Sequence, residues 1–120
     1  MRLHHVAIIV SDLERSSHFY EGVLGLERDI RPDLGFSGLF YGLGNSQQIH
    51  LMQINDPYID CKKPSHGGRD VHFALACDDL EGLMARLAAE SIEYTRSRSG
   101  RAAIFFRDPD GNAIEVVQVS

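Results

Sequence analysis

HVAIIVSDLE at residues 5–14 and HFALACDDLE at residues 72–81 are two versions of one segment. His, Ala, Asp, Leu and Glu recur at matching places, and the leading histidines, His5 and His72, are 67 residues apart. Each copy begins with an apolar, partly β-branched run that is typical of a strand. Each then reaches a polar Asp-Leu-Glu that is typical of a helix start. We therefore expect each copy to contribute a strand followed by a helix.

A second pair of segments, residues 38–54 and 103–119, agrees mainly in its apolar positions, at an offset of 65 residues. Self-similarity at a fixed spacing indicates that a chain is built from repeated units. The sequence therefore predicts two related modules, residues 1–60 and 69–120. A linker at about 61–68 contains the Pro and Gly residues that are typical of a loop.

Both predicted helices carry start signals. In the first, Ser11 and Glu14 fit a capping box, and Gly25 is expected to end the helix. In the second, Asp78 is the expected N-cap. The apolar stripes expected to face the core are Leu13, Tyr20, Val23 and Leu24 in the first helix, and Leu80, Leu83, Met84 and Leu87 in the second.

Three shorter strands are expected after each helix. Their predicted ranges are 26–31, 36–43 and 47–54 in the first module, and 92–96, 102–107 and 113–119 in the second. The Asp-Pro-Asp-Gly-Asn run at 108–112 predicts a tight hairpin turn between the last two. The order βαβββ, repeated twice, predicts an α+β fold.

Composition excludes several classes of protein. The 120 residues include 12 Lys and Arg against 17 Asp and Glu, a net charge of −5, whereas nucleic-acid binders usually carry a basic surplus. No apolar run approaches the roughly 20 residues of a membrane helix. The first residues lack the apolar stretch of a signal peptide, so we expect a cytoplasmic protein. Cys61 and Cys77 are then expected to be free thiols.

Four polar residues lie within apolar strands, at repeat-equivalent places. His5 and His72 are equivalent in the first strands, and His50 and Glu115 are equivalent in the last strands. If a pseudo-two-fold axis relates the modules, the four side chains can converge on that axis. A lone strand histidine is usually a hydrogen-bonded core residue, but an unpaired buried carboxylate is costly, and a divalent cation removes this cost. Three imidazoles and one carboxylate suit Fe, Mn, Co, Ni or Zn better than Ca or Mg.

The remaining histidines are expected to lie outside this cluster. His4 falls on the strand face opposite to His5, and a structural or surface role is expected. His18 lies beside two serines on the helix, so we expect it to be exposed. His66 is expected in a solvated loop.

Three further residues are weaker candidates for substrate contacts. Arg101 and Arg69 each precede a strand and are able to hold an anionic group of a substrate, although a surface arginine is the simpler interpretation. Tyr41 alternates with leucines and is a core residue by default, with a pocket hydroxyl as the alternative.

The stretches LHHVAIIVSDLERSSHFYEGVLGLE and FFRDPDGNAIEVVQ resemble the vicinal oxygen chelate superfamily. This superfamily includes glyoxalase I, fosfomycin-resistance transferases, extradiol dioxygenases and bleomycin-binding proteins. The resemblance implies two tandem βαβββ modules that form a curved, cup-like sheet around a metal, commonly in a homodimer. It also implies that His5, His72 and Glu115 are the shared metal ligands and that His50 is the fourth.

The resemblance implies a metal-dependent lyase or isomerase of glyoxalase type. Such an enzyme acts on a small substrate with vicinal oxygens through a metal-stabilised enolate or alkoxide, and Glu115 would be both ligand and catalytic base. The alternatives are a non-catalytic protein that binds a drug or metabolite, and an Fe(II) extradiol-type dioxygenase. Ile9 and Ile54 stand where glutathione-using members carry their anchors, and Ala7 stands where fosfomycin transferases carry a Thr.

Overall fold

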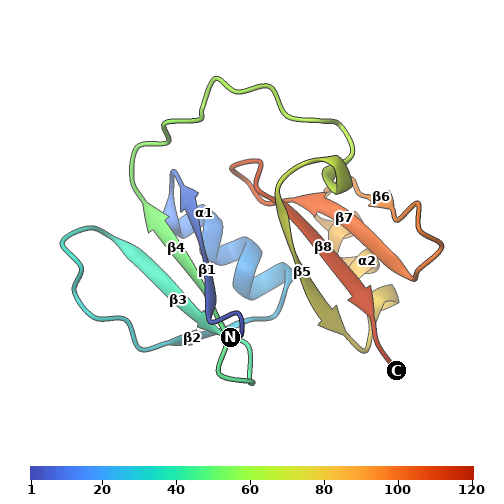
Figure 1. Ribbon diagram of the computed structural model, residues 1–120, viewed down its shortest axis with the longest axis horizontal. Coiled ribbons are helices and arrows are strands. Elements are labelled where there is room, and N and C mark those ends of the chain that lie inside the picture. The colour runs from blue at the N-terminus through green and yellow to red at the C-terminus, as the bar shows by residue number, and fades with distance from the viewer. The chain divides into compact units, whose positions relative to one another are not determined.

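The computed structural model describes residues 1–120 and divides into two compact units, Met1–Asp60 (unit 1) and Cys61–Ser120 (unit 2) (Figure 1). Unit 1 contains β1 (His5–Val10), α1 (Leu13–Ser17), the π-helix η1 (His18–Val23), β2 (Glu27–Asp29), β3 (Gly38–Gly42) and β4 (Gln48–Gln53). Unit 2 contains the 3₁₀-helix η2 (Gly67–Arg69), β5 (His72–Cys77), α2 (Leu80–Ala89), β6 (Thr95–Arg96), β7 (Ala103–Arg107) and β8 (Ala113–Gln118). The predicted α+β fold of two βαβββ modules is confirmed.

The two sheets have the same topology. The strand orders are β1-β4-β3-β2 and β5-β8-β7-β6, and in each sheet the first and last strands of the module are parallel while the other pairs are antiparallel. The register repeats as well, because Ala7 pairs with His50 and Ala74 pairs with Glu115. Side chains of paired residues, and of residues two apart on one strand, share a face. His5 therefore shares a face with His50, and His72 shares a face with Glu115.

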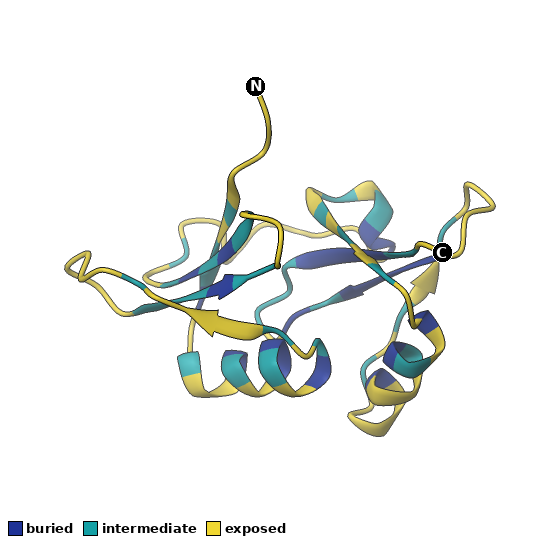
Figure 2. Cartoon of the chain, turned by 90° about the horizontal axis from the view of Figure 1, so that it is seen from below, coloured by how far each residue is buried: buried dark blue, intermediate teal, exposed yellow.

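The core of each unit lies between its sheet and its helical segment. In unit 2, β7 and β8 are the most continuously buried strands (Figure 2), and Leu80, Leu83 and Leu87 of α2 are buried with them. The buried apolar residues of unit 1 are Val10, Phe19, Tyr20, Val23, Tyr41, Ile49 and Leu51. On the first strands, the face that carries His5 and Ala7, and the equivalent face with His72 and Ala74, is exposed. Apolar packing thus accounts for one face of each sheet.

Both helices begin one residue later than predicted. The N-cap of α1 is Asp12, not Ser11, and the N-cap of α2 is Asp79, not Asp78. Each aspartate accepts hydrogen bonds from backbone N–H groups of the first turn, and its negative charge also suits the N-terminus of a helix.

A glutamine from the last strand of each module fixes these helix starts. Gln53 Oε1 accepts the N–H of Leu13 at 2.9 Å, and Gln118 Oε1 accepts the N–H of Leu80 at 2.8 Å. Because these leucines are the first helical residues, each glutamine satisfies a donor that the helix itself leaves unpaired. This contact between distant residues is the same in the two modules.

The first helix does not keep a regular α-helical stripe. From His18 onward it is a π-helix, and the Leu24 N–H bonds the carbonyl of Phe19, five residues back. The wider turns rotate the buried face, so Phe19 is buried whereas Leu13 and Leu24 are only half-buried. Gly25 ends the helix as predicted, with φ at +71°.

The predicted hairpin turn between β7 and β8 is confirmed. The Asp108 carboxylate accepts the N–H groups of Asp110 and Asn112, and Gly111 takes the positive φ that this turn requires. Strands β2 and β6 are shorter than predicted, at three and two residues. None of the helices combines the length and the hydropathy that a membrane crossing requires.

Candidate functional site

In unit 2, His72 and Glu115 face each other from neighbouring parallel strands. The imidazole Nε2 of His72 lies 3.4 Å from Oε2 of Glu115, whose residue is only 4 % exposed. The other carboxylate oxygen, Oε1, accepts a hydrogen bond from Arg101 at 2.8 Å. Glu115 therefore places one oxygen against a guanidinium and the other against an imidazole nitrogen.

The second ring nitrogen of His72 determines what Glu115 faces. Nδ1 lies 2.9 Å from the backbone carbonyl oxygen of Asp70, which can only accept, so Nδ1 carries the hydrogen. In the neutral imidazole, Nε2 then presents a lone pair to the carboxylate. With Nε2 also protonated the contact is an ion pair, whereas in the neutral imidazole two acceptors face each other across 3.4 Å and a cation can lie close to both. The donor set of this pair therefore fits a transition metal ion, which imidazole and carboxylate ligands both suit.

In unit 1, the repeat-equivalent pair is His5 and His50. Their rings stack with centroids 4.1 Å apart, and the other face of His50 stacks on Phe40 at 3.5 Å. His50 Nε2 also hydrogen-bonds to Gln48 Oε1 at 2.8 Å. Burial, and then the nearby His5, lower the pKa of His50. This favours the neutral imidazole, which is the form that binds metals.

Each unit thus brings together its own two members of the predicted set of four. Within the structure, no group of three His, Cys, Asp or Glu side chains is placed to hold one ion. A centre built from His5, His50, His72 and Glu115 needs both pairs, and their meeting stays a prediction. The structure provides two pairs of side chains of metal-binding types at the same register positions of two equivalent sheets.

The weaker candidates for substrate contacts occupy three different environments. Arg101 lies beside Glu115, yet its side chain is 58 % exposed, and its Nε donates to Ser99 Oγ at 3.0 Å. Arg69 is exposed at the end of η2. Tyr41 is fully buried and its hydroxyl donates to a carboxylate oxygen of Glu21 at 2.8 Å, so the core role is the correct one. Burial also raises the pKa of Tyr41.

The predictions for the other histidines have mixed outcomes. His18 is exposed, as expected. His4 is also exposed, which agrees with the expected surface role, although β1 begins only at His5 and the assignment of His4 to a strand face does not apply. Its Nδ1 lies 2.9 Å from Nδ1 of His5.

His66 is not solvated, because the end of the predicted linker folds as η2 against β7. Only 9 % of the residue is exposed, its Nδ1 lies 2.6 Å from Thr95 Oγ1, and its ring meets the edge of Phe105. Burial lowers the pKa of His66, as does the charge of Arg98.

Sequence reasoning missed the residues that orient the ligands. Phe40 and Phe105 pair in register with His50 and Glu115, and a closer comparison of the repeats would have shown this equivalence. Asp70, whose carbonyl accepts from His72, carries no signal beyond its place two residues before that histidine.

Residues 2–116 match the sequence profile of the Glyoxalase/Bleomycin resistance protein/Dioxygenase superfamily. The chain belongs to this superfamily. Its members are generally metal-dependent and act on small molecules, which agrees with the two ligand pairs. The resemblance to vicinal oxygen chelate proteins is therefore confirmed.

Several superfamily members align with nearly the whole chain. Glyoxylase I 4 of Arabidopsis thaliana is 31 % identical over 120 residues, covering 95 % of this chain and 68 % of that protein. The lactoylglutathione lyase of Neisseria meningitidis serogroup A / serotype 4A is 30 % identical over 126 residues, covering 98 % and 91 %. The mitochondrial methylmalonyl-CoA epimerase of Mus musculus is 32 % identical over 125 residues, covering 96 % and 70 %. A glyoxalase/dioxygenase from Nostoc punctiforme shares the fold, with a TM-score of 0.76 at 22 % identity, covering 99 % and 91 %.

Proposed function

We propose that the protein is a metal-dependent lyase or isomerase of glyoxalase type that moves a proton on a small substrate with two neighbouring oxygen atoms. The observation that carries this proposal is the buried Glu115 carboxylate, whose Oε2 lies 3.4 Å from Nε2 of His72. The relatives named as a lyase and an epimerase support it at about 30 % identity.

The metal would be held by His5, His50, His72 and Glu115. Fe, Mn, Co, Ni and Zn suit this set, since imidazole favours these ions and Ca and Mg prefer oxygen ligands alone. The bound ion would supply Lewis acidity toward the substrate's oxygens.

Glu115 is the residue we assign to proton transfer. It is the only carboxylate of the set, and one of its oxygens, Oε2, is free of the Arg101 guanidinium. A carboxylate next to a substrate C–H group can take a proton from one carbon and return it to the adjacent carbon.

Arg101 is the residue we assign to recognition of an anionic group on the substrate. Its guanidinium is more than half exposed while one nitrogen holds Glu115, so other donors are available to a second carboxylate or to a phosphate. Glutathione is disfavoured as the carrier of the substrate, because Ile9 and Ile54 replace the anchors that the resemblance predicts.

Hydrogen exchange at the substrate's carbon tests this proposal. The protein, loaded in turn with Mn²⁺, Co²⁺, Ni²⁺ and Zn²⁺, is incubated in D₂O with a panel of 2-hydroxy and 2-oxo acids, hemithioacetals, acyl thioesters and catechols. We expect deuterium at the carbon beside the oxygen of at least one substrate, and loss of this exchange in His72→Ala. His18→Ala, which changes an exposed histidine, is the matched control.

Two outcomes would favour the alternatives. Tight binding of a panel compound without exchange or turnover would favour a non-catalytic binding protein. Oxygen consumption with catechols in the Fe²⁺-loaded protein alone would favour a dioxygenase.

A further inference from the structure

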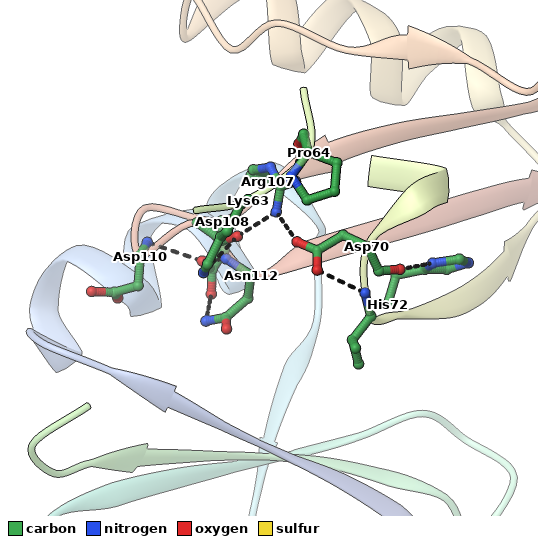
Figure 3. Close-up of polar contacts among 10 residues, drawn as sticks. Lys63, Pro64, Asp70, His72, Arg107, Asp108, Asp110 and Asn112 are labelled. Carbon is green, nitrogen blue, oxygen red and sulfur yellow. Dashed lines mark hydrogen bonds and ion pairs between the residues drawn. The ribbon is translucent and has the colours of Figure 1, made fainter. Parts of the chain in front are cut away.

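Arg107, the last residue of β7, ties three segments of unit 2 together (Figure 3). Its Nη1 donates to Asp70 Oδ2 at 2.8 Å and to the Gly111 carbonyl at 2.7 Å, and its Nη2 donates to the Pro64 carbonyl at 2.6 Å. The side chains of Arg107 and Asp70 are 24 % and 21 % exposed. These bonds are short and partly shielded from water, so the guanidinium is fixed in one orientation.

Every polar group of Asp70 takes part in a hydrogen bond. Oδ2 accepts from Arg107, Oδ1 accepts the N–H of Val71 at 2.8 Å, and the backbone N–H donates to the Gly67 carbonyl at 3.1 Å. The remaining group is the Asp70 backbone carbonyl, which accepts from His72 Nδ1 at 2.9 Å. Figure 3 shows this chain of contacts, from Arg107 through Asp70 to the imidazole. The carbonyl that meets His72 is therefore a fixed acceptor.

A fixed acceptor determines the tautomer of an imidazole. In the neutral ring the hydrogen stays on Nδ1, and Nε2 then has its lone pair 3.4 Å from Glu115 Oε2. Histidine ligands of metals generally need such a partner on the second nitrogen, and its loss typically lowers metal affinity.

Unit 1 has no equivalent of the Arg107–Asp70 pair. The repeat offsets place Leu3 at the position of Asp70 and Gly42 at the position of Arg107, so neither the carboxylate nor the guanidinium is present. His5 Nδ1 instead lies 2.9 Å from Nδ1 of His4, a second titratable ring. The contrast shows that the fold does not require the Arg107–Asp70 pair, since the same sheet forms without it.

We propose that Arg107 and Asp70 are positioning residues for His72: together they hold its imidazole with hydrogen on Nδ1 and with Nε2 free to face Glu115. The purpose of this positioning rests on the proposed function, whereas the contacts among Arg107, Asp70 and His72 are present in the chain without metal. The competing explanation is that Arg107 only fastens the Pro64 and Gly111 loops and has no effect on His72.

Nitrogen spectroscopy of the metal-free protein separates these explanations. In uniformly ¹⁵N-labelled protein at neutral pH, two-bond ¹H–¹⁵N correlations identify the protonated nitrogen of each histidine. We expect His72 in the wild type to carry its hydrogen on Nδ1. A wild-type His72 protonated only on Nε2 would overturn the inference without any variant.

Variants then test the role of the pair. Arg107→Gln is expected to give a mixture of both His72 tautomers and to weaken binding of Zn²⁺, measured by calorimetry, by about 10- to 100-fold. Arg107→Lys keeps the positive charge and one donor, so it is expected to lose less Zn²⁺ affinity. It is also expected to remain folded if Arg107→Gln does not fold. Arg28→Gln is the matched control, because it breaks a 2.8 Å ion pair with Glu21 in unit 1.

The outcomes distinguish this inference from the proposed function. An unchanged His72 tautomer in folded Arg107 variants, or an equal loss of Zn²⁺ affinity in Arg28→Gln, would overturn the positioning role. If the tautomer shifts in the Arg107 variants but the wild type binds no transition metal, the positioning role stands and the proposed function fails.

Discussion

Nε2 of His72 lies 3.4 Å from Oε2 of Glu115, across the neighbouring strands β5 and β8 of unit 2. The hydrogen of the imidazole is on Nδ1, and the other oxygen of the carboxylate is held by Arg101. In unit 1 the repeat-equivalent pair is His5 and His50, whose rings stack with centroids 4.1 Å apart.

Replacing Glu115 by Gln tests whether this residue is more than a ligand. The amide keeps an oxygen of similar reach but cannot accept a proton, and general-base catalysis contributes typically 10²–10⁴-fold. We expect Glu115→Gln, at saturating metal, to lose at least about 10²-fold in turnover and in deuterium exchange. His50→Gln is expected to lose much less, because His50 takes no part in the proposed proton transfer. Equal losses at full metal occupancy would contradict a special role for Glu115.

Replacing Arg101 by Met removes a positive charge from beside Glu115. Since like charges repel, we expect Mn²⁺ to bind roughly three- to tenfold more tightly in calorimetry, while KM for anionic substrates rises. The metal-free variant should melt at a lower temperature than the wild type, because a buried carboxylate has lost its partner. Weaker Mn²⁺ binding together with an unchanged KM would instead indicate that Arg101 has only a structural role.

The buried His66 predicts a pH dependence of stability. Its pKa is lowered by burial and by the charges of Arg98, Arg69 and His72. The unfolded chain therefore binds a proton that the folded chain resists. The free energy of unfolding should be highest above the unfolded value of about 6.5 and should decline as the pH falls below it.

Denaturant titrations of metal-free protein between pH 5 and 8 measure this effect. Because the pKa of His50 is lowered as well, His66→Asn should flatten the decline only in part. A decline of the same size in His66→Asn as in the wild type would rule out a contribution from His66.

Assembly is a separate prediction. A module of about 60 residues buries little apolar surface, and both sheets have free edges. Large apolar side chains are also exposed, including Ile30 at 90 % and Val71 at 92 %. We expect light scattering at micromolar concentration to give twice the mass of one chain. A particle with the mass of a single chain would show that homodimerisation is wrong.

The sequence predicted the part of the fold that a repeat encodes. Offsets of 67 and 65 residues identified His5 and His72, and likewise His50 and Glu115, as equivalent positions. In the two sheets Ala7 pairs with His50 and Ala74 pairs with Glu115, so the equivalent strands have the same register. The alternation of strand side chains then gave the correct face. Such a pattern is local, so it can be found along the chain without knowing the packing.

The helix starts and the partners of the ligands were not predictable in this way. Gln53 reaches Leu13 across 40 residues, and Arg101 reaches Glu115 across 14, so neither contact appears in a local pattern. His66 was expected in a solvated loop, yet η2 packs it against Phe105. These contacts depend on tertiary packing, which overrides the composition of the segment.

A crystal structure of the Co²⁺- or Zn²⁺-loaded protein shows whether the two pairs of side chains from equivalent sheets form one metal centre, as we propose. We expect a single ion with the imidazole nitrogens of His5, His50 and His72 and the carboxylate of Glu115 at about 2.0–2.2 Å. A structure in which any two of His5, His72 and Glu115 point away from a common ion would contradict it.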